Sequence, residues 1–473
     1  LVQQGPLTRR AMGEYFGTDG IRGIPGEFPL VKDFVARLGY EAAKAILSGP
    51  RRAGSAAPEA LLARDSRDSG RLLGKWLTLG MQAAGCRVTD IGVAPTPAVS
   101  FLAPRRKAAF GAVISASHNP AEFNGIKFFS GKGVKLSERA ERAIEAALKK
   151  NRARALPARI DGEKYRRAPE LLRDYEDFIV GTIAPAVAKG EGPLSGMKVV
   201  LDCAHGAACA SAPRALARLG AKVYAIGCVP DGKNINAGVG ALYTAAMSRE
   251  TVRRGADCGF SLDGDADRVI FADETGAVFD GDDIIAMAAL EMKREGRLRR
   301  SKVVLTVMSN CGIINRLREE GIKTVQVPVG DKYVTRAIDG EKLSLGGEAS
   351  GHIIFRDFSP TGDGLLTAVQ VLALLRRSGR KLGDYRKLLP KYPQSLRAVA
   401  VSKKVPLESI PGFARKLRDI ERGLGGGRVF VRYSGTEPKL RVLAEGPDAP
   451  AVESAAREII SYYEKHTEGI LCR

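Results

Sequence analysis

The stretch Ala109–Pro120, AFGAVISASHNP, decides how the chain folds. Its apolar half, Ala109–Ser115, has the length and composition of a strand buried inside a sheet. The polar half ends in a proline and predicts a loop. A second strand is predicted over Ile126–Ser130 (IKFFS), and Ser137 predicts a helix start as its N-cap. Buried strands followed by loops and helices indicate an α/β protein.

The same alternation continues along the chain. Short β-branched runs alternate with helical stretches, as in α/β proteins built on mostly parallel sheets. The chain has 473 residues, enough for three or four domains. We expect three similar α/β units and a smaller last one. Strands are predicted over Lys198–Cys203, Lys222–Ile226, Cys258–Asp263, Val269–Ala272, Lys302–Met308, Arg397–Ser402 and Val429–Arg432, and helices over Ala208–Leu219, Asp282–Lys293, Asp363–Arg377 and Ala449–Glu464.

Composition excludes several classes of protein. The net charge is +21, but Lys and Arg are dispersed and aromatic residues make up only 6% of the chain, so we expect a generally basic surface and no nucleic-acid partner. No run approaches the roughly 18 apolar residues of a membrane span. Residues 1–11 lack the apolar centre of a signal peptide, and Met12 is one candidate start.

The seven cysteines are scattered and include no CxxC pair. An odd, unpaired set fits a reducing cytosol, so a cytoplasmic protein is expected. We interpret these thiols as buried residues without chemistry.

Ser117 follows the buried strand and is a candidate nucleophile, with His118 and Asn119 as hydrogen-bonding neighbours. The chain has only four histidines, and no Ser-His-Asp triad is evident. His118 could reach the Ser117 hydroxyl as a base only through an unusual turn. On these residues alone, an ordinary turn remains an alternative.

Asp263, Asp265 and Asp267 alternate between two predicted strands. Three converging carboxylates repel one another unless a cation binds, and hard oxygen ligands suit Mg²⁺. A calcium-binding EF-hand is excluded because Arg268 occupies the position that needs glycine and the flanks are strands. A solvated acidic turn is the alternative.

A phosphate-binding loop is predicted near the C-terminus. Backbone amides, hydroxyls and guanidiniums are the groups that bind a phosphate dianion. A structural turn is the alternative. The candidate residues are Arg432, Ser434, Gly435, Thr436 and Arg441.

Two further groups are weaker. Glu348, Ser350 and His352 alternate within a glycine-rich segment, and their expected position on one side would suit sugar hydroxyls. Arg22, in the segment Phe16–Gly23, is a candidate for holding a phosphoserine.

These five groups, in this order, resemble the α-D-phosphohexomutase family over nearly the whole chain. Together they are far more specific than any one motif. The stretches that carry the resemblance are Tyr15–Gly23 (YFGTDGIRG), Ile114–Ser130 (ISASHNPAEFNGIKFFS), Thr306–Asn310 (TVMSN), Val329–Val334 (VGDKYV) and Thr361–Gly364 (TGDG).

The resemblance implies four domains around a central cleft, each contributing one loop. Three would be similar α/β domains with mixed sheets, and the last a smaller α+β domain. The expected ranges are 12–160 with the phosphoserine loop, 161–267 with the metal loop, 268–384 with the sugar loop and 385–473 with the phosphate loop.

The resemblance also implies a reaction. Phosphorylated Ser117 would give its phosphoryl group to glucosamine 6-phosphate, and the bisphosphate would return the other one. One Mg²⁺ per subunit would be held by Ser117 and the three aspartates. A hexose 1,6-bisphosphate or another phosphoryl donor would first charge the serine.

Other residues receive their roles from the same resemblance. Lys127 would be a general acid or proton carrier, and Arg22, His118 and Arg268 would act beside it. The sugar loop would hold hydroxyls and the phosphate loop the distal phosphate. The partner is a small sugar phosphate, with no membrane, and the protein is a monomer or homodimer.

Two alternatives stay open. Ala349 stands where the family usually has a larger residue, so glucose or mannose phosphates could replace the amino sugar. The remoter alternative is a Mg²⁺-dependent sugar phosphatase, which would release inorganic phosphate.

Overall fold

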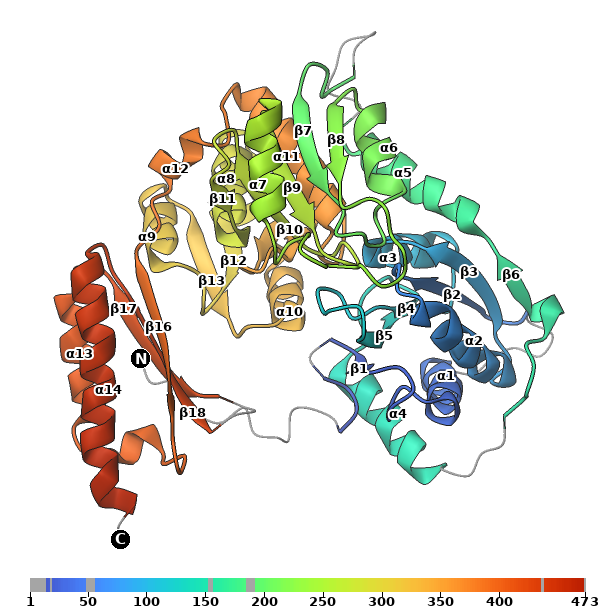
Figure 1. The fold of residues 1–473 in the computed structure, drawn as a ribbon, viewed down its shortest axis with the longest axis horizontal. Helices are drawn as coiled ribbons and strands as arrows, with labels where there is room; N and C mark the ends of the chain where they lie inside the picture. Colours follow the sequence, from blue (N-terminus) through green and yellow to red (C-terminus); the bar gives the residue numbers. More distant parts are fainter. Residues whose placement is uncertain are drawn as a thin grey trace. The chain divides into compact units, whose positions relative to one another are not determined.

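The structure is a computed structural model, which describes residues 14–17, 19–47, 56–151, 156–183, 192–434 and 438–471. These residues divide into two compact units (Figure 1). The larger unit runs from 14 to 307 and from 323 to 386, and the smaller one comprises 308–322 and the chain from 387 onward. The four domain boundaries predicted from the sequence stay predictions.

The first sheet of the larger unit has six strands in the order β1-β5-β4-β2-β3-β6. Strands β2, β3, β4 and β6 run parallel, while β5 pairs antiparallel with both β4 and β1, so the sheet is mixed. Helices α1 and α2 pack on each other, and α3 packs on β2 and β4. The bounds are β1 Ile21–Gly23, α1 Lys32–Ile46, β2 Glu59–Arg64, α2 Ser69–Ala83, β3 Arg87–Val93, α3 Thr96–Arg105, β4 Phe110–Ile114, β5 Asn124–Ser130, α4 Glu138–Lys150 and β6 Tyr165–Arg167.

The second sheet has the order β11-β10-β9-β7-β8. Its β7, β8 and β9 are parallel, and β9, β10 and β11 form an antiparallel meander. Helix α7 packs on β7, β9 and β10, and α5 packs on α6. The bounds are α5 Leu172–Gly181, β7 Lys198–Asp202, α6 Ser211–Arg218, β8 Lys222–Ile226, α7 Ala245–Arg254, β9 Cys258–Leu262, β10 Val269–Asp273 and β11 Val278–Phe279.

The third sheet has the order β13-β12-β14-β15, with only β15 antiparallel. Helices α8 and α10 pack on β14, and α11 packs on β15. The bounds are α8 Gly281–Arg294, β12 Lys302–Thr306, β13 Lys323–Val327, α10 Asp331–Glu341, β14 Leu345–Gly347, β15 Ile353–Phe355, α11 Gly364–Ser378 and α12 Asp384–Leu388.

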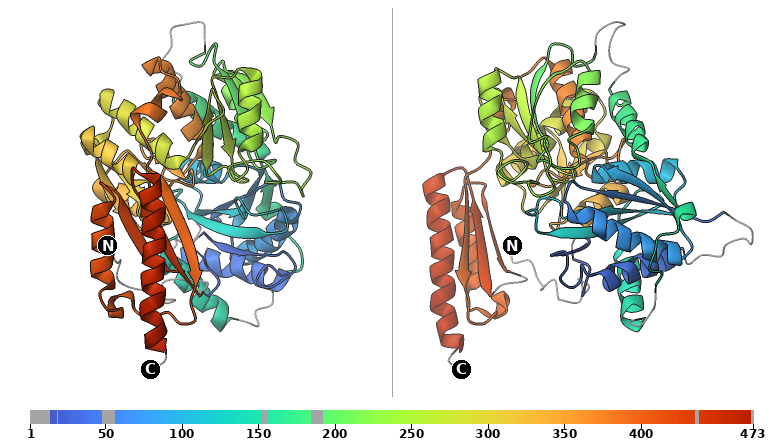
Figure 2. Two further views of the ribbon diagram at one scale, coloured as in Figure 1. Left: turned by 60° about the vertical axis from the view of Figure 1, so that its left-hand side comes forward. Right: turned by 45° about the vertical axis from the view of Figure 1, so that its right-hand side comes forward.

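The smaller unit is an α+β structure with a three-stranded antiparallel sheet, ordered β16-β18-β17. Helices α13 and α14 pack together on this sheet (Figure 2). Their apolar contact with the strands forms a core of its own. The bounds are α9 Cys311–Glu319, β16 Gln394–Ala400, α13 Phe413–Gly423, β17 Arg428–Tyr433, β18 Lys439–Glu445 and α14 Ala449–Leu471.

The predicted elements are found with small shifts at their ends. The buried strand predicted over Ala109–Ser115 is β4, with every residue buried. The predicted cap at Ser137 is confirmed, because its side chain accepts the Ala140 amide at the start of α4. The stretch from Ser378 to Pro393 contains the short helix α12.

Helices α1 and α2 approach closely because glycines face the contact. A Cβ on Gly80 would lie 1.8 Å from the Ala36 carbonyl oxygen, and one on Gly39 would lie 2.4 Å from the Leu77 oxygen. Backbone cannot yield as a flexible side chain can. Both helices cover a core that includes Leu38, Leu77 and strand residues of the first sheet.

We predict that Gly80→Ala lowers the stability of the folded protein by about 1–3 kcal/mol or more, because the added methyl overpacks two helix backbones. Gly340→Ala in α10 is the matched control, since a Cβ there meets nothing within 4 Å and alanine favours helix by up to about 1 kcal/mol. Thermal unfolding of both variants measures the difference. Equal melting temperatures would contradict this account of the contact.

Candidate active site

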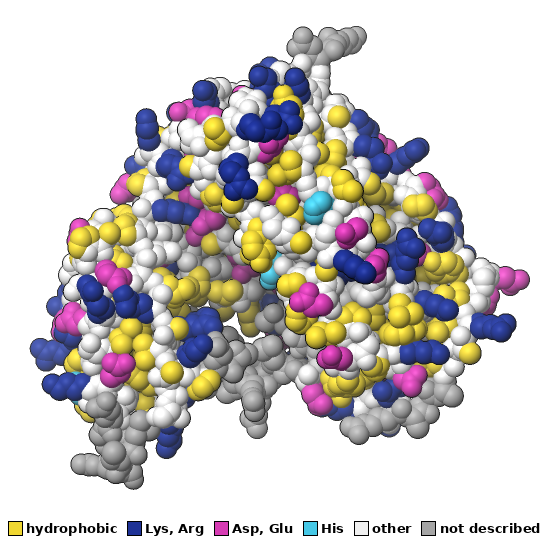
Figure 3. Space-filling model, viewed as in Figure 1, with side chains coloured by type: hydrophobic (Ala, Val, Ile, Leu, Met, Phe, Trp, Pro, Cys, Tyr) yellow, Lys and Arg dark blue, Asp and Glu magenta, His cyan; other side chains and the backbone are white. Residues whose placement is uncertain are grey.

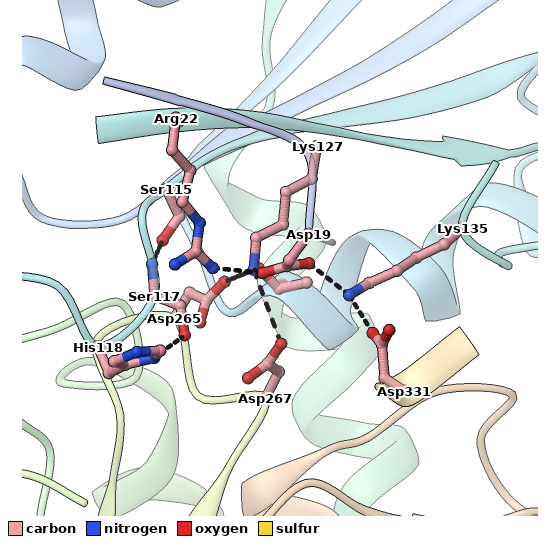
Figure 4. Close-up of polar contacts among 12 residues, drawn as sticks. Asp19, Arg22, Ser115, Ser117, His118, Lys127, Lys135, Asp265, Asp267 and Asp331 are labelled. Carbon is pink, nitrogen blue, oxygen red and sulfur yellow. Dashed lines mark hydrogen bonds and ion pairs between the residues drawn. The ribbon is translucent and has the colours of Figure 1, made fainter. Parts of the chain in front are cut away.

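Three loops of the larger unit converge on one small volume (Figure 4). The loop after β4 carries Ser117, the turn between β9 and β10 carries the three aspartates, and Asp19 and Arg22 come from β1 and the turn before it. The loops approach at backbone distance, since a Cβ on Gly264 would lie 2.6 Å from the Ser117 carbonyl oxygen. The aspartate turn therefore rests directly on the serine loop.

Ser117 is fully buried and its backbone is left-handed, with φ at 54°. A non-glycine residue in that region costs roughly 1–3 kcal/mol and persists only where its surroundings impose it. Its amide donates to Ser115 Oγ at 2.8 Å, and its carbonyl accepts from Asn236 at 2.9 Å and Arg67 at 3.3 Å. Its hydroxyl donates to Asp263 Oδ2 at 2.5 Å. Every polar group of the serine is thus directed, and the hydroxyl faces the aspartates.

His118 lies beside the same hydroxyl, with Nδ1 3.3 Å from Ser117 Oγ. The left-handed serine supplies the unusual turn that this contact between neighbours requires. Burial, together with the guanidiniums of Arg268 and Arg22, lowers the pKa of His118 to about 4. The imidazole is therefore neutral near pH 7, and its Nδ1 can form a hydrogen bond with the Ser117 hydroxyl in the direction set by its tautomer.

The three aspartates are buried, and each places a carboxylate oxygen within 4.8 Å of the other two. Burial and the charges of Asp267 and Asp265 raise the pKa of Asp263 well above its ordinary value. Among the residues that the structure describes, neither Asp265 Oδ1 nor Asp267 Oδ1 has a hydrogen-bond partner, although both atoms are buried. Orphaned carboxylate oxygens beside a like charge are what a hard divalent cation satisfies. The donor set fits Mg²⁺.

Lys127 connects this loop to the first sheet. Its Nζ lies 2.9 Å from Asp265 Oδ2, 3.7 Å from Asp267 Oδ2 and 2.7 Å from Asp19 Oδ2 (Figure 4). Burial disfavours the ammonium, but these three carboxylates outweigh it and raise the pKa of Lys127. The side chain is therefore a buried ammonium that is protonated near neutral pH, at the predicted site of phosphoryl transfer.

The ion network continues beyond the predicted residues. Lys135 Nζ contacts Asp19 Oδ1 at 2.5 Å and also pairs with Asp331 at the start of α10. None of these three residues was predicted as a site residue from the sequence. Asp19 and Asp331 stand within the quoted stretches Tyr15–Gly23 and Val329–Val334, which was a usable signal, whereas Lys135 lies in no motif.

Arg22 and Arg268 each have a buried Nε–H group near the serine loop without a hydrogen-bond acceptor among the described residues. Arg22 contacts Asp19 at 2.5 Å and Asn119 Oδ1 at 3.4 Å, and Arg268 follows the last aspartate. Within the described ranges, the Nε of each is buried and has no hydrogen-bond partner. Such groups can hold an anion, which is the role predicted for both residues.

The sugar-loop residues do not share one side, and that expectation is wrong. Glu348 is buried and accepts the Gly330 amide at 2.9 Å, while Ser350 is exposed. His352 is buried, and its Nδ1 lies 3.8 Å from Asp267 Oδ2, so it contacts the aspartate loop. The reason is that a turn separates β14 from β15, and a turn breaks the alternation that a strand would give.

The smaller unit contains the predicted phosphate-binding residues. Arg432 and Arg441 are direct partners across β17 and β18. Burial, then the charge of Arg441, lowers the pKa of Arg432. Like charges in opposed positions destabilise a sheet, and a bound dianion would remove that repulsion. Ser434 is buried directly after β17, whereas Gly435 and Thr436 lie outside the described residues.

Comparison with known proteins agrees with this arrangement. Four domain descriptions of phosphoglucomutase/phosphomannomutase match the chain: alpha/beta/alpha domain I over 13–155, domain II over 175–276, domain III over 280–392 and the C-terminal domain over 396–461. A phosphoglucosamine mutase of Bdellovibrio bacteriovorus is 41% identical over 452 residues, 95% of this chain and 98% of that protein. The chain belongs to the phosphoglucomutase/phosphomannomutase family. Another relative within this family, a phosphoglucosamine mutase of Cereibacter sphaeroides, is 42% identical over 94% of this chain and 98% of its own length.

Solved structures of phosphohexomutases share the fold. A phosphoglucomutase/phosphomannomutase family protein from Burkholderia thailandensis has a TM-score of 0.74 at 21% identity, covering 97% of this chain and 98% of that one. The Aspergillus fumigatus N-acetylphosphoglucosamine mutase, in complex with GlcNAc-6P and magnesium, has a TM-score of 0.60 at 18% identity and covers 98% and 100%. The expected four-domain α/β architecture with mixed sheets is confirmed.

The basic surface has no concentrated patch on the face seen in Figure 3, where Lys and Arg side chains are interspersed with acidic and apolar ones. This distribution agrees with the expectation of a generally basic surface. In the part of the chain that the structure describes, no helix is both long and apolar enough to cross a membrane.

We predict that Asp265→Asn weakens binding of Mg²⁺ or Mn²⁺ by at least about tenfold, because one of three anionic donors is lost. Calorimetric titration of the purified protein measures it. Asp174→Asn is the control, since Asp174 is exposed on α5, away from the aspartate turn. An unchanged affinity in Asp265→Asn would place the cation elsewhere.

Proposed function

We propose that this chain is an isomerase that interconverts glucosamine 6-phosphate and glucosamine 1-phosphate, the phosphoglucosamine mutase reaction. One observation carries the proposal: the Ser117 hydroxyl is held 2.5 Å from Asp263 within a cluster of buried carboxylates that fits a cation. Relatives about 40% identical over nearly the full chain are phosphoglucosamine mutases, which favours the amino sugar as substrate.

The serine would act as the phosphoryl carrier. In the first half-reaction the bond between phosphorus and Ser117 Oγ breaks, a bond forms to the free hydroxyl oxygen of the sugar phosphate, and the hydroxyl proton passes to the protein. In the second half-reaction the other phosphoryl group of the bisphosphate returns to Ser117 Oγ. No water enters the balance, so the product is an isomer and no inorganic phosphate appears.

Surrounding cationic side chains would neutralise the negative charge of the phosphoryl group during transfer. The ammonium of Lys127 stays protonated, so it can neutralise phosphoryl oxygens and supply a proton to Ser117 Oγ as phosphorus leaves. The orphaned Nε groups of Arg22 and Arg268 would donate to the same anion. The aspartates would hold Mg²⁺, which when bound would offset the negative charge of the phosphoryl group.

Position as well as charge lowers the barrier. The pinned backbone of Ser117 keeps its hydroxyl in one orientation, so little entropy is lost when the phosphoryl group is transferred. We propose that Arg432 and Arg441 bind the phosphate that does not react, and that Glu348 and Ser350 bind sugar hydroxyls. A hexose 1,6-bisphosphate would charge the serine initially.

A phosphomannomutase or phosphoglucomutase activity is the second candidate, because the family includes both and the residue at position 349 is a small alanine. Coupled assays with glucosamine 1-phosphate, glucose 1-phosphate and mannose 1-phosphate separate the candidates. We expect the highest kcat/KM with glucosamine 1-phosphate. A higher value with glucose or mannose 1-phosphate would reverse the assignment, and release of inorganic phosphate would indicate a phosphatase.

We predict that Ser117→Ala lowers mutase activity by at least about 10³-fold, because it removes the hydroxyl that is held against Asp263. Intact-mass spectrometry after incubation with a hexose 1,6-bisphosphate tests the carrier directly. The wild-type protein should gain one phosphoryl mass and Ser117→Ala none.

Ser130→Ala is the control for this experiment, since Ser130 is the last residue of β5 and its hydroxyl donates to the Val134 carbonyl at 3.2 Å. It should be phosphorylated as well as the wild type. If Ser117→Ala still gains the mass, the carrier is another residue.

We predict that Arg441→Ala raises the KM for glucosamine 6-phosphate by about 10- to 100-fold, which corresponds to losing one charge-assisted contact to phosphate. Steady-state kinetics give the value. Arg415→Ala on the exposed side of α13 serves as control and should leave KM unchanged. An unaltered KM in Arg441→Ala would show that this pair does not bind substrate phosphate.

A further inference from the structure

Three cysteines that are far apart in sequence meet at one end of the second sheet. The Sγ atoms of Cys203, Cys209 and Cys228 all lie within 4.8 Å of one another. Cys203 is buried, and Cys209 and Cys228 are half-buried. Apart from the aspartate triad, this is the one group among the described residues whose ligand atoms gather in this way.

Strand register produces the cluster. Strands β7 and β8 are parallel neighbours, so Cys203 leaves β7 beside the segment that leaves β8 and carries Cys228. The amide of Cys203 donates to the Ile226 carbonyl at 3.1 Å, and the Cys209 thiol donates to the Gly227 carbonyl at 3.5 Å. The chain from 203 to 209 therefore curls over the end of β8 and brings all three sulfurs to one point.

We propose that these three thiols form a binding site for a thiophilic divalent cation, with Zn²⁺ as the natural candidate. Zn²⁺ binds thiolate sulfur at about 2.3 Å, so tetrahedral ligands lie about 3.8 Å apart. The three Sγ atoms lie within 4.8 Å of one another, so side-chain rotations could bring them to this spacing. Because Cys209 and Cys228 are only half-buried, a water molecule could be the fourth ligand.

Thiols must lose their protons to bind a cation, so binding would release protons and leave thiolates as ligands. Soft sulfur ligands select against Mg²⁺, so this site and the aspartate site would take different ions.

The segment that carries Cys203 and Cys209 is hydrogen-bonded to the loops of the candidate active site. The Ala207 amide, within the cysteine-flanked segment, donates to the Gly264 carbonyl of the aspartate turn at 2.8 Å. The Ala204 carbonyl accepts the amide of Asn236, whose side chain in turn holds the Ser117 carbonyl. A cation bound to the thiols would stiffen the segment on which both catalytic loops rest. The inference concerns the thiols alone and holds whichever sugar phosphate is the substrate.

Metal titration of the reduced, full-length protein tests the proposal, with Mg²⁺ in excess to occupy the aspartates. Co²⁺ serves as a spectroscopic probe, because thiolate ligands produce an intense charge-transfer absorption that carboxylates do not. We expect one equivalent of Co²⁺ to give this absorption and one equivalent of Zn²⁺ to abolish it. Zn²⁺ should also raise the melting temperature.

Two variants and a control make the result specific. Cys228→Ala and Cys209→Ala should each weaken Zn²⁺ binding by at least 100-fold while retaining mutase activity. Cys258→Ala, which removes a buried thiol of β9 outside the cluster, should bind as the wild type does. The proposal is overturned if the reduced wild type shows no thiolate absorption, if both cluster variants retain it, or if two of the three thiols form a disulfide and the protein binds no metal.

Discussion

Burying three carboxylates in one six-residue turn is the constraint on which the active site depends. Each charge raises the cost of the next, and the raised pKa of Asp263 expresses that cost. The ammonium of Lys127 offsets part of this electrostatic cost, because it forms ion pairs with both Asp265 and Asp19. Two carboxylate oxygens still have no hydrogen-bond donor among the described residues, so the turn is complete only with a further cation. In the proposed function, this unpaired charge would hold the cation that assists phosphoryl transfer.

The serine loop that packs against the aspartate turn also carries a cost in stability. Ser117 adopts a strained backbone that costs stability, and Asn236, Arg67 and Ser115 hold it there. In this conformation the Ser117 hydroxyl points toward Asp263 and donates a hydrogen bond to it. The strained serine loop and the repelling carboxylates are therefore held together. Strand β4 positions the serine loop, and strands β9 and β10 position the aspartate turn against it.

Much of the fold and of the reaction centre could be predicted from the sequence, because both rest on local patterns. The buried run before Ser117 and the alternating aspartates each report a strand end and its loop within a dozen residues. The expected position of Glu348, Ser350 and His352 on one side was wrong for the same reason. They alternate in sequence, but a turn separates β14 from β15. Period-two reasoning holds only where the chain is a strand.

Contacts between distant segments had no local signal. Lys135 joins Asp19 to Asp331 only because β5, β1 and the start of α10 meet in space. The cysteines make the same point more sharply: their spacing suits no common metal motif, and scattered thiols are ordinarily inert. Parallel pairing of β7 with β8 turns that scatter into a cluster of ligand atoms. A sheet places the ends of its parallel strands together whatever their separation in sequence, so a fold of this class can gather scattered thiols as the ligand atoms of a soft-metal site.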